Sequence, residues 1–332
     1  MPTILIIGAG LAGLTAAREL TQKGHTVTVL DKGRGVGGRL ATRRMANGRA
    51  DHGAQYFSAQ SKEFQALTQT MQQAGLVHEW HLEQSDPASF RHPRWVGSAG
   101  MNSIAKYLAQ GLDVRTGCTV TRITPSETGW EVKAREGDKS LTFSADVLIV
   151  TIPAPQALLL CDASELVLTD EDRAALMAIQ YAPCLSVMLQ LSGSSQLPKP
   201  GGLKQTDGDD QQHSPVAWLA DNAQKGISPH QTTVTLHASH AFSQQHLDDP
   251  DQETLIPQLL ADVAMYVPAE TIVDQQVHRW RYSNAIVRYP HPFLAAQTHA
   301  PLLFGGDGFG NGNVEGAFLS GLALGRAVNS QQ

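Results

Sequence analysis

The sequence predicts an α/β fold in which a Rossmann-like nucleotide-binding domain is interrupted by an inserted α+β domain. A Gly-rich strand–helix–strand pattern occupies residues 4–31, and a second Gly-rich turn follows an apolar strand at residues 302–309. Between about 158 and 277 the chain has strand and helix patterns without a phosphate-binding turn. We therefore expect the two Gly-rich regions to share one domain, with a second domain inserted between them.

The pattern at residues 4–31 is typical of a dinucleotide-binding βαβ unit. Apolar residues 4–7 predict a buried strand, residues 14–20 predict a small-residue helix that ends at Gly24, and residues 26–30 predict a second strand. In this order, the glycines between the first strand and the helix indicate a dinucleotide-binding turn, whereas an isolated Gly-rich turn would be only weak evidence for one.

Each glycine of the turn has a separate expected task. Gly8 permits the tight turn, Gly10 lets backbone N–H groups approach a pyrophosphate, and Gly13 allows close packing of helix on strand. The helix N-terminus adds partial positive charge. Asp31, at the end of the second strand, is placed to accept a hydrogen bond from a ribose hydroxyl.

Two further segments narrow the choice of dinucleotide. Residues 34–39 (RGVGGR) hold a glycine doublet between arginines, which suits a backbone that passes close to a diphosphate, and residues 51–57 read DHGAQYF. Together with the βαβ unit, these segments resemble the flavin-dependent amine oxidase superfamily. The resemblance implies FAD as the cofactor.

The region near residue 305 predicts a second contact with the cofactor. Asp307 follows Gly306 at the end of a short strand and can accept from ribityl hydroxyls, and a small-residue helix is expected at residues 314–328. The N-terminus of this helix, near Asn313 and Val314, can point at the flavin N1–C2=O edge, where its dipole would stabilise the reduced state.

The composition limits the classes of partner. The 332-residue chain is 42% hydrophobic and 17% charged with a net charge of -6, which indicates a globular protein and gives no reason to expect nucleic acid or membrane as a partner. The three cysteines lack metal-site spacing, so no metal is expected and a reducing, cytoplasmic setting is predicted. The first apolar run is too short for a membrane span.

The other predicted helices and strands determine the boundaries of the two predicted domains. Helices are expected at 61–75, near 104–108, at 170–180 and at 251–266, an antiparallel meander at 114–144, and a buried strand at 146–153. The resemblance to flavoproteins implies that this strand rejoins the sheet beside the first strand. The predicted FAD-binding domain comprises residues 1–75, 97–157 and 278–332. The predicted substrate domain comprises residues 76–96 and 158–277.

Over essentially its whole length, the chain resembles the renalase family, and its bacterial members more than its animal ones. The segments that carry this resemblance are residues 8–13, 37–39, 50–51, 53–56, 280–281 with 283, and 305–309. It implies the fold of p-hydroxybenzoate-hydroxylase-like flavoproteins and contacts with FAD from Ala12, Arg39, Gln55 and Tyr56. The residues predicted to bind the cofactor are Gly8, Gly10, Ala12, Gly13, Asp31, Lys32, Gly38, Arg39, Gln55, Tyr56, Val120, Gly306, Asp307 and Val314.

The same resemblance implies an activity. Renalases oxidise 2-dihydro and 6-dihydro isomers of NAD(P) to NAD(P)+, and electrons pass through FAD to oxygen to give hydrogen peroxide. True amine oxidases place an aromatic cage residue where this chain has Asn313, which cannot supply a π face but can hydrogen-bond a carboxamide. No His or Cys lies within residues 305–317, so the FAD is expected to be non-covalent.

A dihydropyridine already carries its hydride, so no strong catalytic base is required and no catalytic residue is assigned. The candidates for the substrate pocket are Tyr56, Trp95, Trp280 and Asn313, although buried tryptophan is also an ordinary core residue. Two other functions remain open at this point: a flavin-dependent amine oxidase or desaturase, and a flavin-binding protein without turnover.

Overall fold

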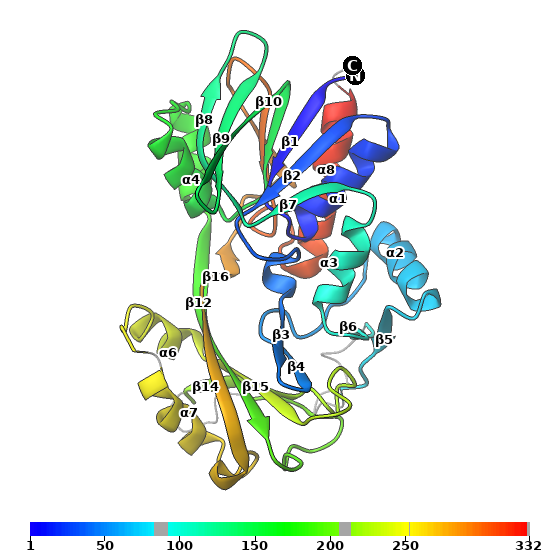
Figure 1. Ribbon diagram of the computed structural model, residues 1–332, viewed down its shortest axis with the longest axis vertical. Coiled ribbons are helices and arrows are strands. Elements are labelled where there is room, and N and C mark those ends of the chain that lie inside the picture. Colours follow the sequence, from blue (N-terminus) through cyan, green and yellow to red (C-terminus); the bar gives the residue numbers. More distant parts are fainter. Residues whose placement is uncertain (83–91, 206–213, 252, 331–332) are drawn as a thin grey trace. The chain divides into compact units, whose positions relative to one another are not determined.

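The structure is a computed structural model that describes residues 1–82, 92–205, 214–251 and 253–330 (Figure 1). The chain divides into two compact units, and each is assembled from separate stretches of sequence. The first unit comprises residues 1–38, 104–180 and 285–332. The second comprises residues 39–103 and 181–284.

These units differ in their boundaries from the predicted domains. Residues 39–75, 97–103 and 278–284 belong to the second unit, and residues 158–180 belong to the first. The first difference has a clear cause, because the hairpin that begins at Thr42 hydrogen-bonds to strands of the second unit, as described below. Residues 83–91 and 206–213 of the predicted substrate domain lie outside the described residues.

The first unit is built on a six-stranded sheet of order β17-β18-β11-β1-β2-β7, parallel except for the edge strand β17. The strands are β1 (Thr3–Ile7), β2 (Thr26–Asp31), β7 (Asp113–Thr116), β11 (Val147–Val150), β17 (Phe293–Ala296) and β18 (Leu302–Gly305). Residues Ile4–Ile7 and Val147–Val150 are buried throughout, as expected for central strands covered on both faces. The predicted Rossmann-like fold is confirmed.

Two helices that are far apart in sequence lie side by side in this unit (Figure 1). They are α1 (Leu11–Gln22) and α8 (Asn313–Ser330). A Cβ added at Gly321 would lie 2.4 Å from the Ala12 carbonyl oxygen, and one at Gly325 would lie 2.7 Å from the Glu19 side chain. Close packing on α1 therefore explains Gly321 and Gly325, whereas a Cβ at Gly316 would meet the Asn311 backbone.

The predicted meander forms a separate three-stranded sheet of β8 (Cys118–Pro125), β9 (Trp130–Glu136) and β10 (Lys139–Ala145). Its predicted first part, residues 114–115, is wrong, because it lies in β7, which pairs in parallel with β2. The chain then enters β11, which pairs with β1 as predicted. Pro153 ends the strand but also starts α4 (Ala154–Ala163) as its N-cap, and the sequence interpretation missed this helix. Helix α3 (Asn102–Ala109) precedes the meander, and α5 (Asp170–Met177) follows α4.

The second unit contains a five-stranded sheet of order β13-β14-β15-β12-β16. Its strands are β12 (Gln180–Leu191), β13 (Gly202–Lys204), β14 (Val216–Asp221), β15 (Thr233–Ala238) and β16 (Ile272–Val287). Helix α7 (Ile256–Asp262) contributes Ile256 and Leu259 to a core that also holds Leu189 and Leu236 of the sheet. A short helix, α6 (His240–Gln245), follows β15.

A small hairpin, β3 (Thr42–Met45) and β4 (Gly48–Asp51), also belongs to the second unit. The Oγ1 atoms of Thr233 and Thr235 on β15 donate to the backbone carbonyls of Arg49 and Asp51. These bonds fix the hairpin to β15. The unit also contains η1 (Gly38–Leu40), α2 (Lys62–Gln73), and the paired strands β5 (Val77–Glu79) and β6 (Trp95–Gly97).

The helix predicted at 251–266 is shorter than expected. A 3-10 turn at Glu253–Leu255 leads into α7, which has Pro257 in its first turn and ends at Asp262, and a second 3-10 turn follows at Ala269–Thr271. The helix predicted at 170–180 ends at Met177, because the long strand β12 begins at Gln180. Within the described part of the chain, no helix has both the length and the apolar character needed to cross a bilayer.

Candidate functional site

The turn between β1 and α1 presents an open helix N-terminus. Gly10 is the N-cap of α1 and makes no side-chain hydrogen bond to the first turn, which also contains no acidic residue. The Leu14 N–H bonds back to the Gly10 carbonyl, so helical bonding starts there. The N–H groups of the preceding first-turn residues can therefore be satisfied by an anion at the positive end of the helix.

Gly10 and Gly13 lack side chains for different reasons. A Cβ at Gly13 would lie 2.0 Å from the Gly8 carbonyl oxygen, so glycine is required for contact of helix and strand. A Cβ at Gly10 would meet no protein atom within 4 Å, and its φ of -76° suits any residue. Protein packing does not demand glycine at this position, whereas a diphosphate lying against the backbone does. The turn thus fits the pyrophosphate of FAD.

Asp31 lies beside this turn. Its Oδ2 accepts from the Ala9 N–H at 2.7 Å and its Oδ1 accepts from the Gly33 N–H at 2.6 Å. Each carboxylate oxygen can accept more than one hydrogen bond, so capacity for a ribose hydroxyl remains. Lys32, the next predicted residue, is exposed. Gly38 has a φ of 52° and follows Gly37, whose N–H donates to the Ala9 carbonyl.

The second Gly-rich segment lies in the same unit. The Gly306 N–H donates to Ser320 Oγ of α8 at 2.8 Å, which ties the end of β18 to the helix. Asp307 follows and is partly exposed. Asn313, with a φ of 57°, begins α8, and Val314 lies in its first turn. Both predicted nucleotide segments therefore belong to the first unit, as do Ala12 on α1 and Val120 on β8.

The arginine after the glycine doublet lies in the second unit, close to the DHGAQYF segment. Its backbone carbonyl accepts from the Ala54 N–H, and a Cβ at Gly53 would lie 2.0 Å from that oxygen. The Arg39 guanidinium donates to the carbonyls of Tyr282 and Ser283 on β16 and lies 5.6 Å from the centre of the Tyr181 ring. The contact of Arg39 with FAD stays a prediction.

Four side chains of the second unit form what we call the ring cluster: His52, His237, His278 and Trp280. The His52 ring stacks on Trp280 at 5.4 Å and meets His278 edge-on at 4.8 Å, and the Trp280 Nε1–H donates to the His52 carbonyl at 2.7 Å. Gln55 joins the cluster because its Nε2 lies 3.3 Å from His237 Nε2 and donates to the Asp51 carbonyl.

Two buried polar atoms at this cluster have no hydrogen-bond partner in the described structure. They are Nδ1 of His52 and Oε1 of Gln55, on side chains that are 5% and 7% exposed. Buried polar atoms are rarely left unpaired, so these two atoms can serve a bound ligand. Of the predicted pocket residues, Trp280 belongs to this cluster and Tyr56 follows Gln55 directly.

Burial keeps the histidines of the cluster neutral. It lowers the pKa of His52 to about 3, with smaller electrostatic contributions in the same direction from His278, Arg43 and His237. The pKa of His237 falls to about 4, again mainly because of burial. The pKa of His278 is also lowered, first by burial and then by Arg43. No carboxylate contributes to these three shifts among the described residues.

These shifts predict acid sensitivity. The folded protein binds protons at His52 and His237 more weakly than the unfolded chain does, so the free energy of unfolding should fall as the pH drops below about 6.5. Each histidine should cost about 2 kcal/mol between pH 7 and pH 5. Chemical denaturation at both pH values checks this. His52→Phe should remove about half of the loss, whereas His81→Gln, an exposed control, should leave it unchanged. If His52→Phe lost as much unfolding free energy between pH 7 and pH 5 as the wild type, His52 would not be a source of the acid sensitivity.

Tyr56 belongs to a second aromatic group. Its ring lies 5.9 Å from Trp218 and 6.4 Å from Trp80, and the Arg94 guanidinium lies 5.1 Å from its centre. Trp95 lies on β6, and its backbone N–H and carbonyl both bond to Phe57. Its indole makes no ring contact with the described residues. The structure therefore does not bring Trp95 into either aromatic group.

A buried ion pair holds the first residue of the DHGAQYF segment in place. Lys225 Nζ lies 2.7 Å from Asp51 Oδ2, and both side chains are fully buried. Asp51 Oδ1 also accepts from Thr42 Oγ1 and from the Met101 N–H. Burial lowers the pKa of Lys225, and the Asp51 carboxylate opposes that shift. The sequence interpretation did not identify Lys225, because nothing in its local pattern distinguishes it from a surface lysine.

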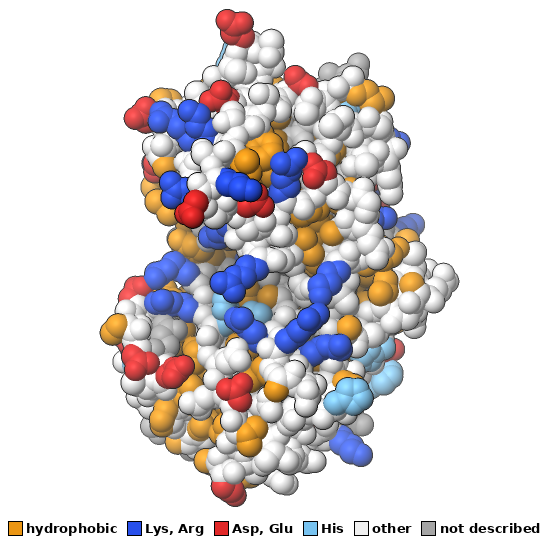
Figure 2. Space-filling model, viewed as in Figure 1, with side chains coloured by type: hydrophobic (Ala, Val, Ile, Leu, Met, Phe, Trp, Pro, Cys, Tyr) orange, Lys and Arg blue, Asp and Glu red, His pale blue; other side chains and the backbone are white. Residues whose placement is uncertain are grey.

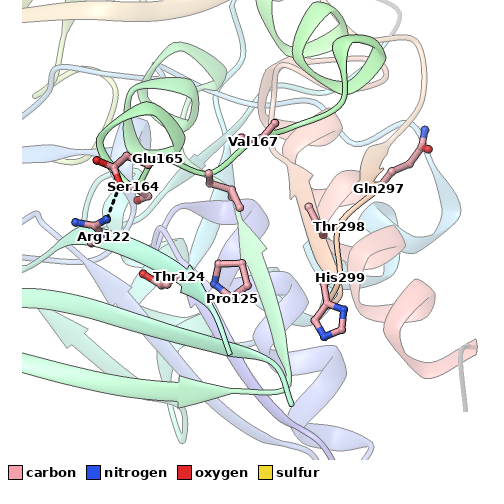
Figure 3. Close-up of a pocket in the computed structure, with 10 residues that line it drawn as sticks. Arg122, Thr124, Pro125, Ser164, Glu165, Val167, Gln297, Thr298 and His299 are labelled. Carbon is pink, nitrogen blue, oxygen red and sulfur yellow. Dashed lines mark hydrogen bonds and ion pairs between the residues drawn. The ribbon is translucent and has the colours of Figure 1, made fainter. Parts of the chain in front are cut away.

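A cavity of about 490 Å³ lies in the first unit, and none of the residues that line it is a predicted site residue (Figure 3). Arg122 and Glu165 line it and pair with each other at 3.1 Å, and Ser164, also in the lining, donates to the Leu160 carbonyl. None of its lining residues belongs to the nucleotide-binding turn or to the ring cluster. The three cysteines are buried free thiols, and burial raises the pKa of each.

Comparison with known proteins gives consistent matches. Residues 6–74 match the family of NAD(P)-binding Rossmann-like domains, and residues 72–329 match the family described as flavin containing amine oxidoreductase. The "Putative flavin-containing monoamine oxidase AofH" of Mycobacterium tuberculosis is 49% identical over 53 residues, which are 16% of this chain and 12% of that protein. The chain thus matches about an eighth of the length of that relative.

Two further matches extend this comparison. "Lysine-specific histone demethylase 1 homolog 1" of Arabidopsis thaliana is 49% identical over 47 residues, or 14% of this chain and 6% of that protein. Among solved structures, "Putative protoporphyrinogen oxidase" from Exiguobacterium sp. 255-15 covers 99% of both chains with a TM-score of 0.72 and 12% identity. At that identity the likeness concerns the fold alone.

Proposed function

Because the chain belongs to the flavin-containing amine oxidoreductase family and uses FAD, we propose its donor: an isomeric dihydronicotinamide dinucleotide, the 2-dihydro or 6-dihydro form of NAD(P). The expected reaction is dihydro-NAD(P) + H+ + O2 → NAD(P)+ + H2O2. Bound FAD would accept the hydride and return the electron pair to oxygen. This is the activity that the renalase resemblance implies.

One observation favours this donor over an amine. The groups that act electrostatically on the histidines of the ring cluster are Arg43, Lys225 and other histidines, and no carboxylate acts on them in the described part of the chain. Lys225 is neutralised by Asp51 and the histidines are neutral, so Arg43 supplies the remaining charge, which repels a protonated amine and attracts the phosphates of a dinucleotide. The sign of the local charge therefore favours an anionic donor.

The neutral state of the cluster suits hydride transfer. His52 and His237, with pKa values of about 3 and 4, are neutral at neutral pH and do not act as general acids. A dihydropyridine loses its hydride without prior removal of a proton, so the reaction does not require acid–base catalysis from these residues. Trp280 offers an aromatic surface for a planar ring, while His52 Nδ1 and Gln55 Oε1 offer hydrogen-bonding atoms for a carboxamide. These residues would bind and orient the donor.

Asn313 supplies a further argument. Its amide lies in the first unit at the start of α8, at the position where amine oxidases carry a cage aromatic. Because an amide has no π face, an amine would lack one wall of its cage, while a nicotinamide carboxamide could hydrogen-bond to it. The proposal therefore assigns Asn313 to recognition of the donor.

An anaerobic stopped-flow titration of the holoenzyme tests the proposal. Stoichiometric 2- or 6-dihydro-NAD(P) should bleach the flavin rapidly and yield NAD(P)+, and admission of oxygen should produce hydrogen peroxide. Ordinary NADH and simple amines should bleach it slowly or not at all. Fast bleaching by a primary amine with release of an aldehyde would assign the protein to the amine oxidases. No bleaching by any donor would indicate a flavin-binding protein without turnover.

A further inference from the structure

We propose that Arg43 and His278 form a subsite for the diphosphate of a nucleotide, on the face of the second unit where β16 meets the β3–β4 hairpin residue His52. Arg43 would balance the phosphate charge, the neutral His278 ring could donate a hydrogen bond to a phosphate oxygen, and the neighbouring rings would position the attached ribose or base. The inference rests on the proposed function in one respect: it names the part of the dinucleotide donor that this subsite would bind.

The hairpin register places Arg43 beside His52. Arg43 pairs with Ala50, and the His52 N–H bonds to the Ala41 carbonyl, which continues the same antiparallel ladder by one more pair. In such a ladder a residue shares its face with its partner and with the residue two places beyond that partner. Arg43 and His52 are therefore diagonal neighbours on one face. The next residue on β3, Arg44, pairs with Arg49 and lies on the opposite face.

On β16, too, alternate residues lie on opposite faces of the strand. His278 and Trp280 share the face that contacts His52, with ring centres 4.3 Å apart from each other. Arg279 and Arg281 lie on the other face, where Arg279 donates to the Leu247 carbonyl at 2.7 Å and Arg281 pairs with Asp248. The two arginines that flank the cluster in sequence are thus already engaged.

Arg43 differs from them. Its guanidinium is exposed and makes no hydrogen bond or ion pair with any described residue, yet it acts electrostatically on both His52 and His278. Figure 2 shows Lys and Arg side chains gathered around histidine side chains over β3, β4 and β16. The histidines are neutral, so Arg43 carries the positive charge of this face, and a guanidinium suits phosphate oxygens in particular.

Nucleotide fragments separate this subsite from the rest of the donor site. The oxidised holoenzyme is titrated with NAD+, with ADP and with nicotinamide riboside, which lacks the diphosphate. We expect Arg43→Gln to weaken binding of NAD+ and ADP by about 10- to 100-fold and to leave nicotinamide riboside within about threefold. Arg43→Lys, which keeps the charge, should recover part of the loss.

Arg44→Gln is the matched control, since it removes the same charge from the same strand on the opposite face. Equal losses in the Arg43 and Arg44 variants would indicate only the general field of the protein and would overturn the subsite. Failure of the wild-type protein to bind ADP would overturn it as well. Binding of ADP that depends on Arg43, in a protein that does not oxidise dihydro-NAD(P), would instead retain the subsite and reject the proposed reaction.

Discussion

Gly10→Ala should leave the apoprotein as stable as the wild type but weaken its binding of FAD, while Gly13→Ala should destabilise the fold itself. At Gly10 a Cβ meets no protein atom within 4 Å, and the backbone is in an ordinary extended conformation. We expect a change of less than about 0.5 kcal/mol in the free energy of unfolding. Binding of FAD should weaken by about tenfold or more, because the methyl group occupies the position expected for the pyrophosphate.

At Gly13 the added Cβ would lie 2.0 Å from the Gly8 carbonyl oxygen and 2.8 Å from Thr151 Oγ1. The first of these is a backbone atom at the end of a central strand, so it cannot move without disturbing the sheet. We expect a loss of about 3 kcal/mol or more in the free energy of unfolding. Denaturation of both apoproteins and titration with FAD measure the two effects. Unchanged FAD affinity in Gly10→Ala would show that the pyrophosphate does not lie against this residue.

Lys225→Met should lower the free energy of unfolding by about 3–5 kcal/mol, because it leaves the Asp51 carboxylate buried without its cation. The pair is fully buried, and the lysine ammonium also lies 5.3 Å from the Trp80 ring. The hydroxyl of Thr42 and the N–H of Met101 still donate to Asp51, but two neutral donors do not replace a positive charge.

A double-mutant cycle with Asp51→Asn isolates the pair. The double variant should lose less stability than the sum of the single variants, because each single change leaves one unpaired buried charge and the double change leaves none. Lys204→Met, an exposed lysine on β13, is the control and should change stability by less than about 0.5 kcal/mol. Additive effects of the two changes would show that Lys225 and Asp51 are not energetically coupled.

Local patterns predicted the nucleotide-binding part of the fold well. Residues 4–31 gave a strand, a helix and a strand, and β18 and α8 were predicted from the Gly-rich segment near residue 306. These elements could be recognised because their glycines and apolar runs form patterns that lie within short stretches of sequence. The helix after Pro153 was missed, since a proline that ends a strand can equally begin a helix.

The ring cluster could not be predicted in the same way. His52 and Trp280 touch across more than two hundred residues of sequence, and the pairing depends on how the hairpin is fixed to β15 and on how β16 faces it. One signal was present, because His278 and Trp280 are two residues apart and share a face in a strand, although no strand was predicted there. Nothing comparable marks Lys225 as the buried partner of Asp51.

The packing of α8 on α1 also affects how the protein is made. Helix α1 leaves the ribosome early, but the helix that covers it follows about 300 residues later, which corresponds to about 15–60 s of synthesis. Strand β18, a neighbour of β11 in the first sheet, is equally late. During this interval the apolar side of α1, with Ala12, Ala16 and Leu20, lacks its partner. A nascent chain therefore cannot complete its nucleotide-binding unit until β18 and α8 have been translated.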